Sequence, residues 1–180
     1  MKKFSLLLLV SIVVLASACK KDDPVTPEPT KEELIVGDWN LESMASNDGI
    51  VLFTLDSADT DTSTFTIQSK NENYRLELNE NKSFNSSGQM TIVTTSTKSD
   101  DEVNIEEKVT DTTSTGTWVI DGDYLVISTS NSEATKNKII ELTADKLKIE
   151  TIERDTFHNK NPTGTIDIIS SNTTISTFKK

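Results

Sequence analysis

Apolar and polar residues alternate along much of the chain after residue 36. Three segments illustrate the pattern through their apolar positions, which are Phe65 and Ile67, then Tyr74, Leu76 and Leu78, then Val103 and Ile105. A period of two with one apolar face is typical of β-strands that bury only one side. The pattern therefore predicts a chain built mainly of half-buried strands.

Four later segments are more continuously apolar, and they span residues 116–120, 124–127, 139–142 and 147–152. The gaps between them are short and hold turn residues such as Asp121-Gly122-Asp123. Short gaps of this kind predict hairpins, so strands that follow each other in sequence should pair antiparallel. We expect one or two further strands between Gly164 and Phe178, broken near residues 170–172, and a long loop over residues 45–62.

Together these segments predict an all-β fold, an antiparallel meander of about eight to ten strands. A sheet of this size avoids exposed edges by closing into a barrel or by packing as two layers. We therefore expect a barrel, with an immunoglobulin-like sandwich as the alternative. One short helix should precede the strands, because Thr30 and Glu33 have the spacing of a capping box and Gly37 ends the helix. The folded domain is expected to span residues 31–180.

The first residues have the form of an export signal. Lys2 and Lys3 precede an apolar run over residues 6–15 that is too short for a membrane-spanning helix. The segment Leu15-Ala16-Ser17-Ala18-Cys19 resembles the lipobox of bacterial lipoproteins, in which the cysteine is lipidated after cleavage. We therefore expect a signal peptide over residues 1–18 and a lipid anchor on Cys19.

Residues 19–30 hold Pro24, Pro27 and Pro29, three of the four prolines of the chain. Such a stretch cannot bury apolar surface and should form an extended tether. Its start, Cys19-Lys20-Lys21-Asp22-Asp23, resembles lipoproteins of Bacteroidota. This resemblance implies attachment to the outer membrane through the lipid anchor, on the periplasmic face or at the cell surface.

The charge and the rare residues exclude several functions. With 29 acidic against 18 basic residues the net charge is -11, which repels phosphate backbones, so nucleic acid is not expected as a partner. One cysteine and one histidine cannot form a Cys/His zinc site or an iron–sulfur cluster. His158 lies in a polar stretch that we expect to form a loop, and the sequence contains no nucleophile-elbow motif. We therefore expect no enzyme activity, no catalytic residues and no cofactor.

The acidic segment over residues 56–61 is a candidate calcium site, since hard cations prefer several carboxylate oxygens. With Asp59 and Asp61 as the first and third positions of an EF-hand, Thr64 falls where glycine is required and Lys70 where glutamate is required. The EF-hand motif therefore fails, and no metal ligands are assigned. An irregular calcium site here, or at residues 100–102, stays open as an alternative.

Two tripeptides carry a family resemblance. Gly37-Asp38-Trp39, which follows the short helix, resembles the opening of lipocalins, and Gly116-Thr117-Trp118 resembles the second half of lipocalin-like domains of Bacteroidota lipoproteins. The resemblance covers residues 31–152 and implies an eight-stranded barrel that holds a small apolar molecule. It also implies a late arginine stacked over the opening tryptophan, for which Arg154 is the candidate.

Two functions from different classes follow. The first is a lipoprotein module that binds a small hydrophobic ligand inside the barrel; the second is a structural or interaction module that presents a strand edge or loop to another envelope protein or to a glycan. The residues expected to fill the core or line a ligand site are Trp39, Phe65, Tyr74, Leu76, Trp118, Ile140, Leu147 and Ile149. Of these, Trp39 is expected to close the base of the barrel rather than to contact a ligand.

Overall fold

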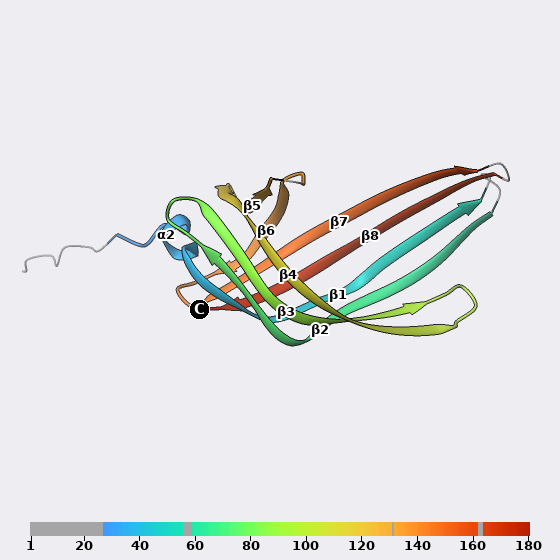
Figure 1. Ribbon diagram of the computed structural model, residues 1–180, viewed down its shortest axis with the longest axis horizontal. Coiled ribbons are helices and arrows are strands. Elements are labelled where there is room, and N and C mark those ends of the chain that lie inside the picture. The colour runs from blue at the N-terminus through green and yellow to red at the C-terminus, as the bar shows by residue number, and fades with distance from the viewer. Residues whose placement is uncertain (1–26, 56–58, 131, 162–163) are drawn as a thin grey trace, which may run out of the picture.

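The alternating segments form one antiparallel sheet of eight strands that follow each other in sequence order and close into a barrel (Figure 1). The structure is a computed structural model that describes residues 27–55, 59–130, 132–161 and 164–180. Its strands are β1 (Gly37–Leu55), β2 (Asp59–Leu78), β3 (Ser83–Thr97), β4 (Val103–Asp121), β5 (Tyr124–Thr129), β6 (Thr135–Leu142), β7 (Lys146–Asn161) and β8 (Gly164–Lys179). Pairing of β1 with β8 completes the ring, which confirms the barrel and excludes the sandwich.

The predicted helix is α2 (Lys31–Ile35), and it begins with the predicted capping box. The Thr30 main-chain amide donates to Glu33 Oε2 over 2.7 Å, and the Glu33 amide donates to Thr30 Oγ1 over 3.2 Å. These bonds satisfy amides that a helix start leaves free. Ile35 is fully buried, and its carbonyl accepts a 2.7 Å hydrogen bond from Trp39 Nε1, so the helix is fixed to the base of the barrel.

The end of the barrel next to α2 is filled by side chains. Its largest fully buried members are Ile35, Trp39, Leu78, Trp118, Leu125 and Leu147. Both buried indole groups donate a hydrogen bond: Trp39 Nε1 to the Ile35 carbonyl, and Trp118 Nε1 to the Asn79 carbonyl over 3.1 Å. An eight-stranded barrel has an interior that side chains can fill, and at this end they do.

The strands differ greatly in length, and this difference opens the barrel at its other end. β5 has 6 residues and β6 has 8, whereas the other strands have 15 to 20. β4 therefore pairs with β5 only over Gly116–Asp121, and β7 pairs with β6 only up to Thr151. Farther from α2, six strands continue as an open curved sheet in which β4 and β7 are the edges (Figure 1).

Two sequence predictions about irregular segments are wrong. β8 is one uninterrupted strand with no break near residues 170–172, because its polar residues pair with β1 on one side and with β7 on the other. Most of residues 45–62 belongs to β1 and β2 rather than to a loop. Two bulges in β1, after Leu41 and after Ser46, accommodate the polar residues 46–49, and the apolar run from Ile50 to Phe53 continues the strand.

The predicted signal peptide, Cys19 and the tether up to Thr26 lie outside the described residues, as do Asp56, Ser57 and Ala58 of the acidic segment. In the part of the chain that the structure describes, no helix is long and apolar enough to cross a membrane.

Candidate functional site

Above the filled base, the barrel contains an open cavity of about 390 Å³. One wall is formed by β1, β2 and β3, which contribute Leu41, Met44, Tyr74, Leu76, Phe84 and Met90. The opposite wall is formed by β4 to β7, which contribute Thr112, Ser114, Thr129, Thr135, Asn137 and Thr151. The cavity therefore has a mainly apolar wall, interrupted by Ser86, that faces a mixed wall of hydroxyl, amide and carboxylate groups. The mixed wall also holds Ile127, Ile149 and Glu153, and β8 adds Ser176 and Phe178.

The strand registers explain why these side chains meet. Tyr74 stands opposite Gly88 on β3, and Leu76 stands opposite Ser86, so a large side chain from β2 faces a small one from β3. The ring of Tyr74 also lies 6.4 Å from that of Phe178, tilted by 52°, which is a favourable aromatic contact. Of the two small partners, Ser86 lines the cavity beside Leu76 and Tyr74, whereas Gly88 lies against the Asn73 main chain.

The polar wall is held by hydrogen bonds. Asn137 is buried, and its amide nitrogen donates to the Leu125 carbonyl over 3.2 Å. Its side-chain oxygen accepts a 2.6 Å hydrogen bond from Thr151 Oγ1, which ties β6 to β7. These bonds fix the orientation of an amide and a hydroxyl at the cavity wall, where each keeps capacity for a further hydrogen bond.

Burial also controls the protonation of the aromatic wall. It raises the pKa of the Tyr74 hydroxyl above its ordinary value, against the opposing effect of a hydrogen bond with Ser86. The phenol group is therefore protonated and uncharged at neutral pH. The apolar wall thus presents no charge to a bound molecule.

A larger, open cleft of about 910 Å³ adjoins the cavity at the end of the barrel away from α2. It lies under the β5–β6 turn and along β7 and β8, with Phe65 and Ile67 of β2 on its far side. Thr135 and Glu153 line both spaces, so the cleft is the entrance to the cavity. This entrance is more polar than the interior, since Glu153, Arg154 and Asp155 lie side by side along it.

The structure separates the residues predicted from the sequence into four groups. Tyr74, Leu76 and Ile149 line the cavity, and Phe65 lines the cleft. Trp39, Trp118 and Leu147 fill the base and line none of these spaces. Ile140 is 44% exposed on the outer face, so its predicted interior position is wrong. Asn137 is buried and Ile139 packs against the core, so the alternation of the strand turns Ile140 outward. The bulge between Ile139 and Glu141 then brings Leu142 back to the core side.

The cation over the opening tryptophan is not Arg154. That arginine lies on β7 opposite Ser171 and lines the cleft, far along the strand from the base. Lys180 takes the place instead, with Nζ 4.7 Å from the centre of the Trp39 ring and 2.7 Å from the Leu34 carbonyl. Desolvation lowers the pKa of this lysine below its ordinary value. The contact joins the last residue of the chain to the helix and the base of the barrel.

Neither His158 nor an acidic cluster forms a second site among the described residues. His158 lies in β7 rather than in a loop, and its Nδ1 is 2.7 Å from Asp167 Oδ1 on β8. No group of three His, Cys, Asp or Glu side chains that could hold a metal ion occurs among the residues that the structure describes. Within those residues, the cavity and its entrance are therefore the candidate site.

Sequence reasoning did not find most of the lining. Met44, Phe84, Met90 and Phe178 were not singled out, since Phe84, for example, has polar residues, Lys82 and Ser86, two places on either side. The polar wall carried no signal, because serine and threonine are frequent throughout the chain and are common on solvent-facing strand surfaces.

An antiparallel meander that closes on itself, with a filled base and an inner cavity, defines an up-and-down β-barrel of the kind that encloses small molecules. The model of the lipocalin-like domain family matches residues 35–149, and the chain belongs to this family. The match ends before β8, the strand that completes the barrel. No curated protein and no solved structure matches the chain.

Proposed function

We propose that the protein binds a small amphipathic hydrophobic molecule inside its barrel and does not act as an enzyme. The observation that carries this proposal is the cavity of about 390 Å³ with one apolar and one hydrogen-bonding wall. Its volume lies within the range of about 300–1,000 Å³ that is common for ligand sites. Membership of the lipocalin-like domain family supports the same function.

The two walls define the class of ligand. Leu41, Met44 and Leu76 favour an apolar body, because burying it against them removes apolar surface from water. Asn137 and Thr151 on the opposite wall are paired with each other and can each still accept a hydrogen bond, which suits a molecule with at least one hydrogen-bonding group. A single-chain amphiphile with an uncharged polar end meets both requirements.

The binding proposal is tested by filling the cavity. Ser114 lines the cavity from β4, and the neighbouring Thr113 is exposed on the outer face of the same strand. We expect N-phenyl-1-naphthylamine, an uncharged apolar probe, to gain fluorescence with the native chain. Ser114→Phe should weaken its binding at least about tenfold, which corresponds to roughly 1.4 kcal/mol. Thr113→Phe adds the same ring outside and should leave binding unchanged; equal binding by both variants would refute the proposal.

We further propose that Cys19 carries the lipid and attaches the domain to the outer membrane. The support comes from the sequence alone, through the lipobox resemblance and the lone cysteine after the export segment. Cells fed with labelled palmitate should incorporate the label into the native chain and not into Cys19→Ala. Recovery of unlabelled native chain in the soluble periplasmic fraction would contradict the anchor.

A second candidate function is an interaction module that contacts another envelope protein or a glycan. The free edges of β4 and β7 favour it, because unpaired strand edges offer main-chain hydrogen-bonding groups to a partner.

A further inference from the structure

We propose that the free edge of β4 pairs with the same edge of a second copy of this chain and forms a symmetric dimer. Among the described strands, none pairs with β4 over Val103–Thr115 on the side away from β3. The ladder between β3 and β4 runs without a register shift over this whole length. The edge is therefore long and regular, without the bulges by which proteins commonly protect such edges.

The main-chain groups of alternate β4 residues face the open side. The Trp118 amide donates to the Lys82 carbonyl on the β3 side over 2.8 Å. Because main-chain direction alternates along a regular strand, even-numbered residues of β4 turn toward β3 and odd-numbered ones turn away from it. The free donors and acceptors therefore belong to Val103, Ile105, Glu107, Val109 and Asp111, with Thr113 and Thr115 nearer the barrel.

The same odd-numbered positions carry exposed apolar side chains. Val103, Ile105 and Val109 are 58%, 63% and 59% exposed on the outer face of the sheet. Apolar side chains this exposed on a free edge are typical of an interaction surface. A partner strand would cover them and pair the main-chain groups at the same time.

The charges on this edge favour a second copy as the partner. Glu106 and Lys108 face the inner side of the sheet, opposite Thr94 and Ile92 of β3, and form no ion pair with any described residue. Antiparallel pairing centred on Glu107 places Glu106 of each copy opposite Lys108 of the other, and Ile105 opposite Val109. Two ion pairs and two apolar pairs result, and such cross-strand pairs stabilise a sheet.

The neighbouring registers are worse for defined reasons. A shift in one direction places Glu106 opposite its own copy, and a shift in the other places Lys108 opposite its own copy. In the favoured register only Glu107 meets its own copy, and each Glu107 is neutralised by Lys70 of its own chain at 2.6 Å. Like charges directly opposite each other destabilise a sheet, so the charges favour the register centred on Glu107 over its two neighbours.

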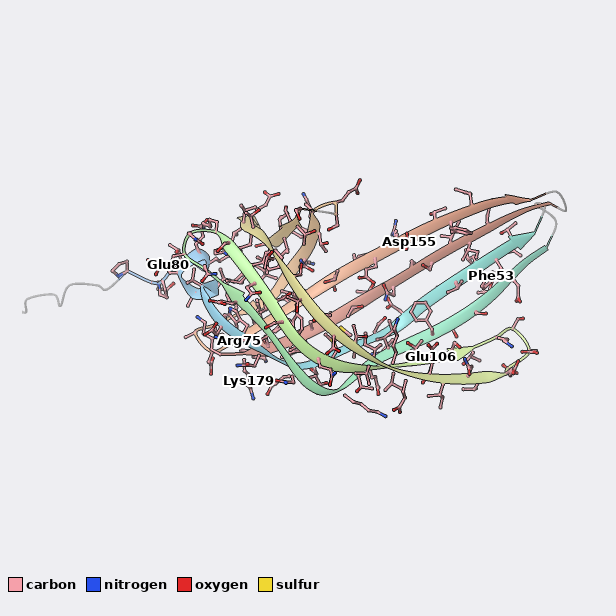
Figure 2. All side chains as sticks on the ribbon, in the orientation of Figure 1. Phe53, Arg75, Glu80, Glu106, Asp155 and Lys179 are labelled. Carbon is pink, nitrogen blue, oxygen red and sulfur yellow. The ribbon has the colours of Figure 1, made fainter. Side chains whose placement is uncertain are left out.

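The edge of β7 does not share this self-complementarity. Glu153 and Asp155 lie on the same side of β7, and any antiparallel self-pairing centred on residues 153–155 places acid opposite acid. Figure 2 shows Glu106 on the projecting part of β4 and Asp155 on the projecting part of β7. The dimer contact therefore falls on β4, with the two copies related by a two-fold axis at Glu107.

Light scattering and charge exchange test the proposal. Residues 19–180 with Cys19→Ser keep every strand of the barrel and carry no acyl chain. We expect this chain to form dimers over the range of tens to hundreds of micromolar, since a single strand pairing is a small interface. Glu106→Lys alone and Lys108→Glu alone should each weaken dimerisation about tenfold, because each replaces attraction by like-charge repulsion. The double variant exchanges the charges and should restore dimerisation.

A disulfide tests the register independently. In the same Cys19→Ser chain, Glu107→Cys places two cysteines opposite each other, with Cα atoms about 5.5 Å apart, within the range that a disulfide spans. Oxidation should produce a covalent dimer. Asp111→Cys is the matched control, since it lies on the same face of β4 but opposite Val103 of the second copy, and it should stay monomeric. A chain that is monomeric at all concentrations, single charge variants that dimerise normally, or equal cross-linking of both cysteine variants would each overturn the proposal.

Discussion

Truncation of Leu147 separates the filled base of the barrel from the rest of the fold. Its side chain is 0% exposed and stands opposite Leu142 on β6 and Phe178 on β8. Replacing a buried leucine by alanine typically costs about 2–5 kcal/mol. Leu147 lines neither the cavity nor the cleft, so its removal creates new empty space, and we expect Leu147→Ala to cost about 3–4 kcal/mol.

The assays are equilibrium unfolding in urea and thermal unfolding, both followed by tryptophan fluorescence. Trp39 and Trp118 are both buried in the base and report on its packing. For a chain of this size, the expected loss lowers the melting temperature by about 6–16 °C. Ile140→Ala is the matched control, because Ile140 is 44% exposed on the outer face and its truncation should cost less than about 1 kcal/mol. Equal losses for the two variants would refute the assignment of Leu147 to the base and Ile140 to the surface.

Two further predictions concern single positions in the chain. Gly88 has φ +126°, and a Cβ there would lie 1.8 Å from the Asn73 carbonyl oxygen, so Gly88→Ala should lower the urea midpoint strongly. Gly122 has φ +62° and open space around it, so Gly122→Ala should cost only about 1 kcal/mol of stability. The Thr173 amide donates a hydrogen bond to Asp48 Oδ1 and lowers the pKa of the Asp48 carboxyl in the folded chain. The ionised carboxylate therefore stabilises the fold at pH values above the pKa that Asp48 has in the unfolded chain. This stabilisation is lost as the pH falls through the lower pKa of the folded chain. Stability should therefore fall more steeply below about pH 4 in the native chain than in Asp48→Asn; parallel pH profiles would contradict this.

Local patterns were sufficient to predict the architecture. Alternation such as Tyr74, Leu76 and Leu78 marks a strand with one buried face wherever it occurs. The short turn at residues 121–123 then fixes the order in which neighbouring strands pair. Because every connection in the barrel joins sequence neighbours, these local signals determine nearly the whole topology.

Features that depend on distant residues escaped the sequence. The polar stretches at residues 46–49 and 170–172 read as irregular, yet the strands that contain them are held in the ladder by neighbours on both sides. Ile140 looked buried because its segment is apolar, but it follows the inward-facing Ile139 and therefore points outward, and a bulge brings Leu142 back to the inner face. The contact of Lys180 with Trp39 joins residues at opposite ends of the domain, which no local pattern reveals. The cavity itself is lined by residues of all eight strands, which no local pattern brings together.

Native mass spectrometry of the chain exported by a Gram-negative host tests the central claim most directly, namely that the barrel carries an amphipathic molecule. Residues 19–180 with Cys19→Ser, isolated without detergent, should show a reproducible additional mass that organic solvent removes. The same mass should be present on Thr113→Phe, which adds its ring outside, and absent from Ser114→Phe, which fills the cavity. A bare native chain that also gains no thermal stability from single-chain amphiphiles would contradict the account, since a bound ligand must stabilise the folded state.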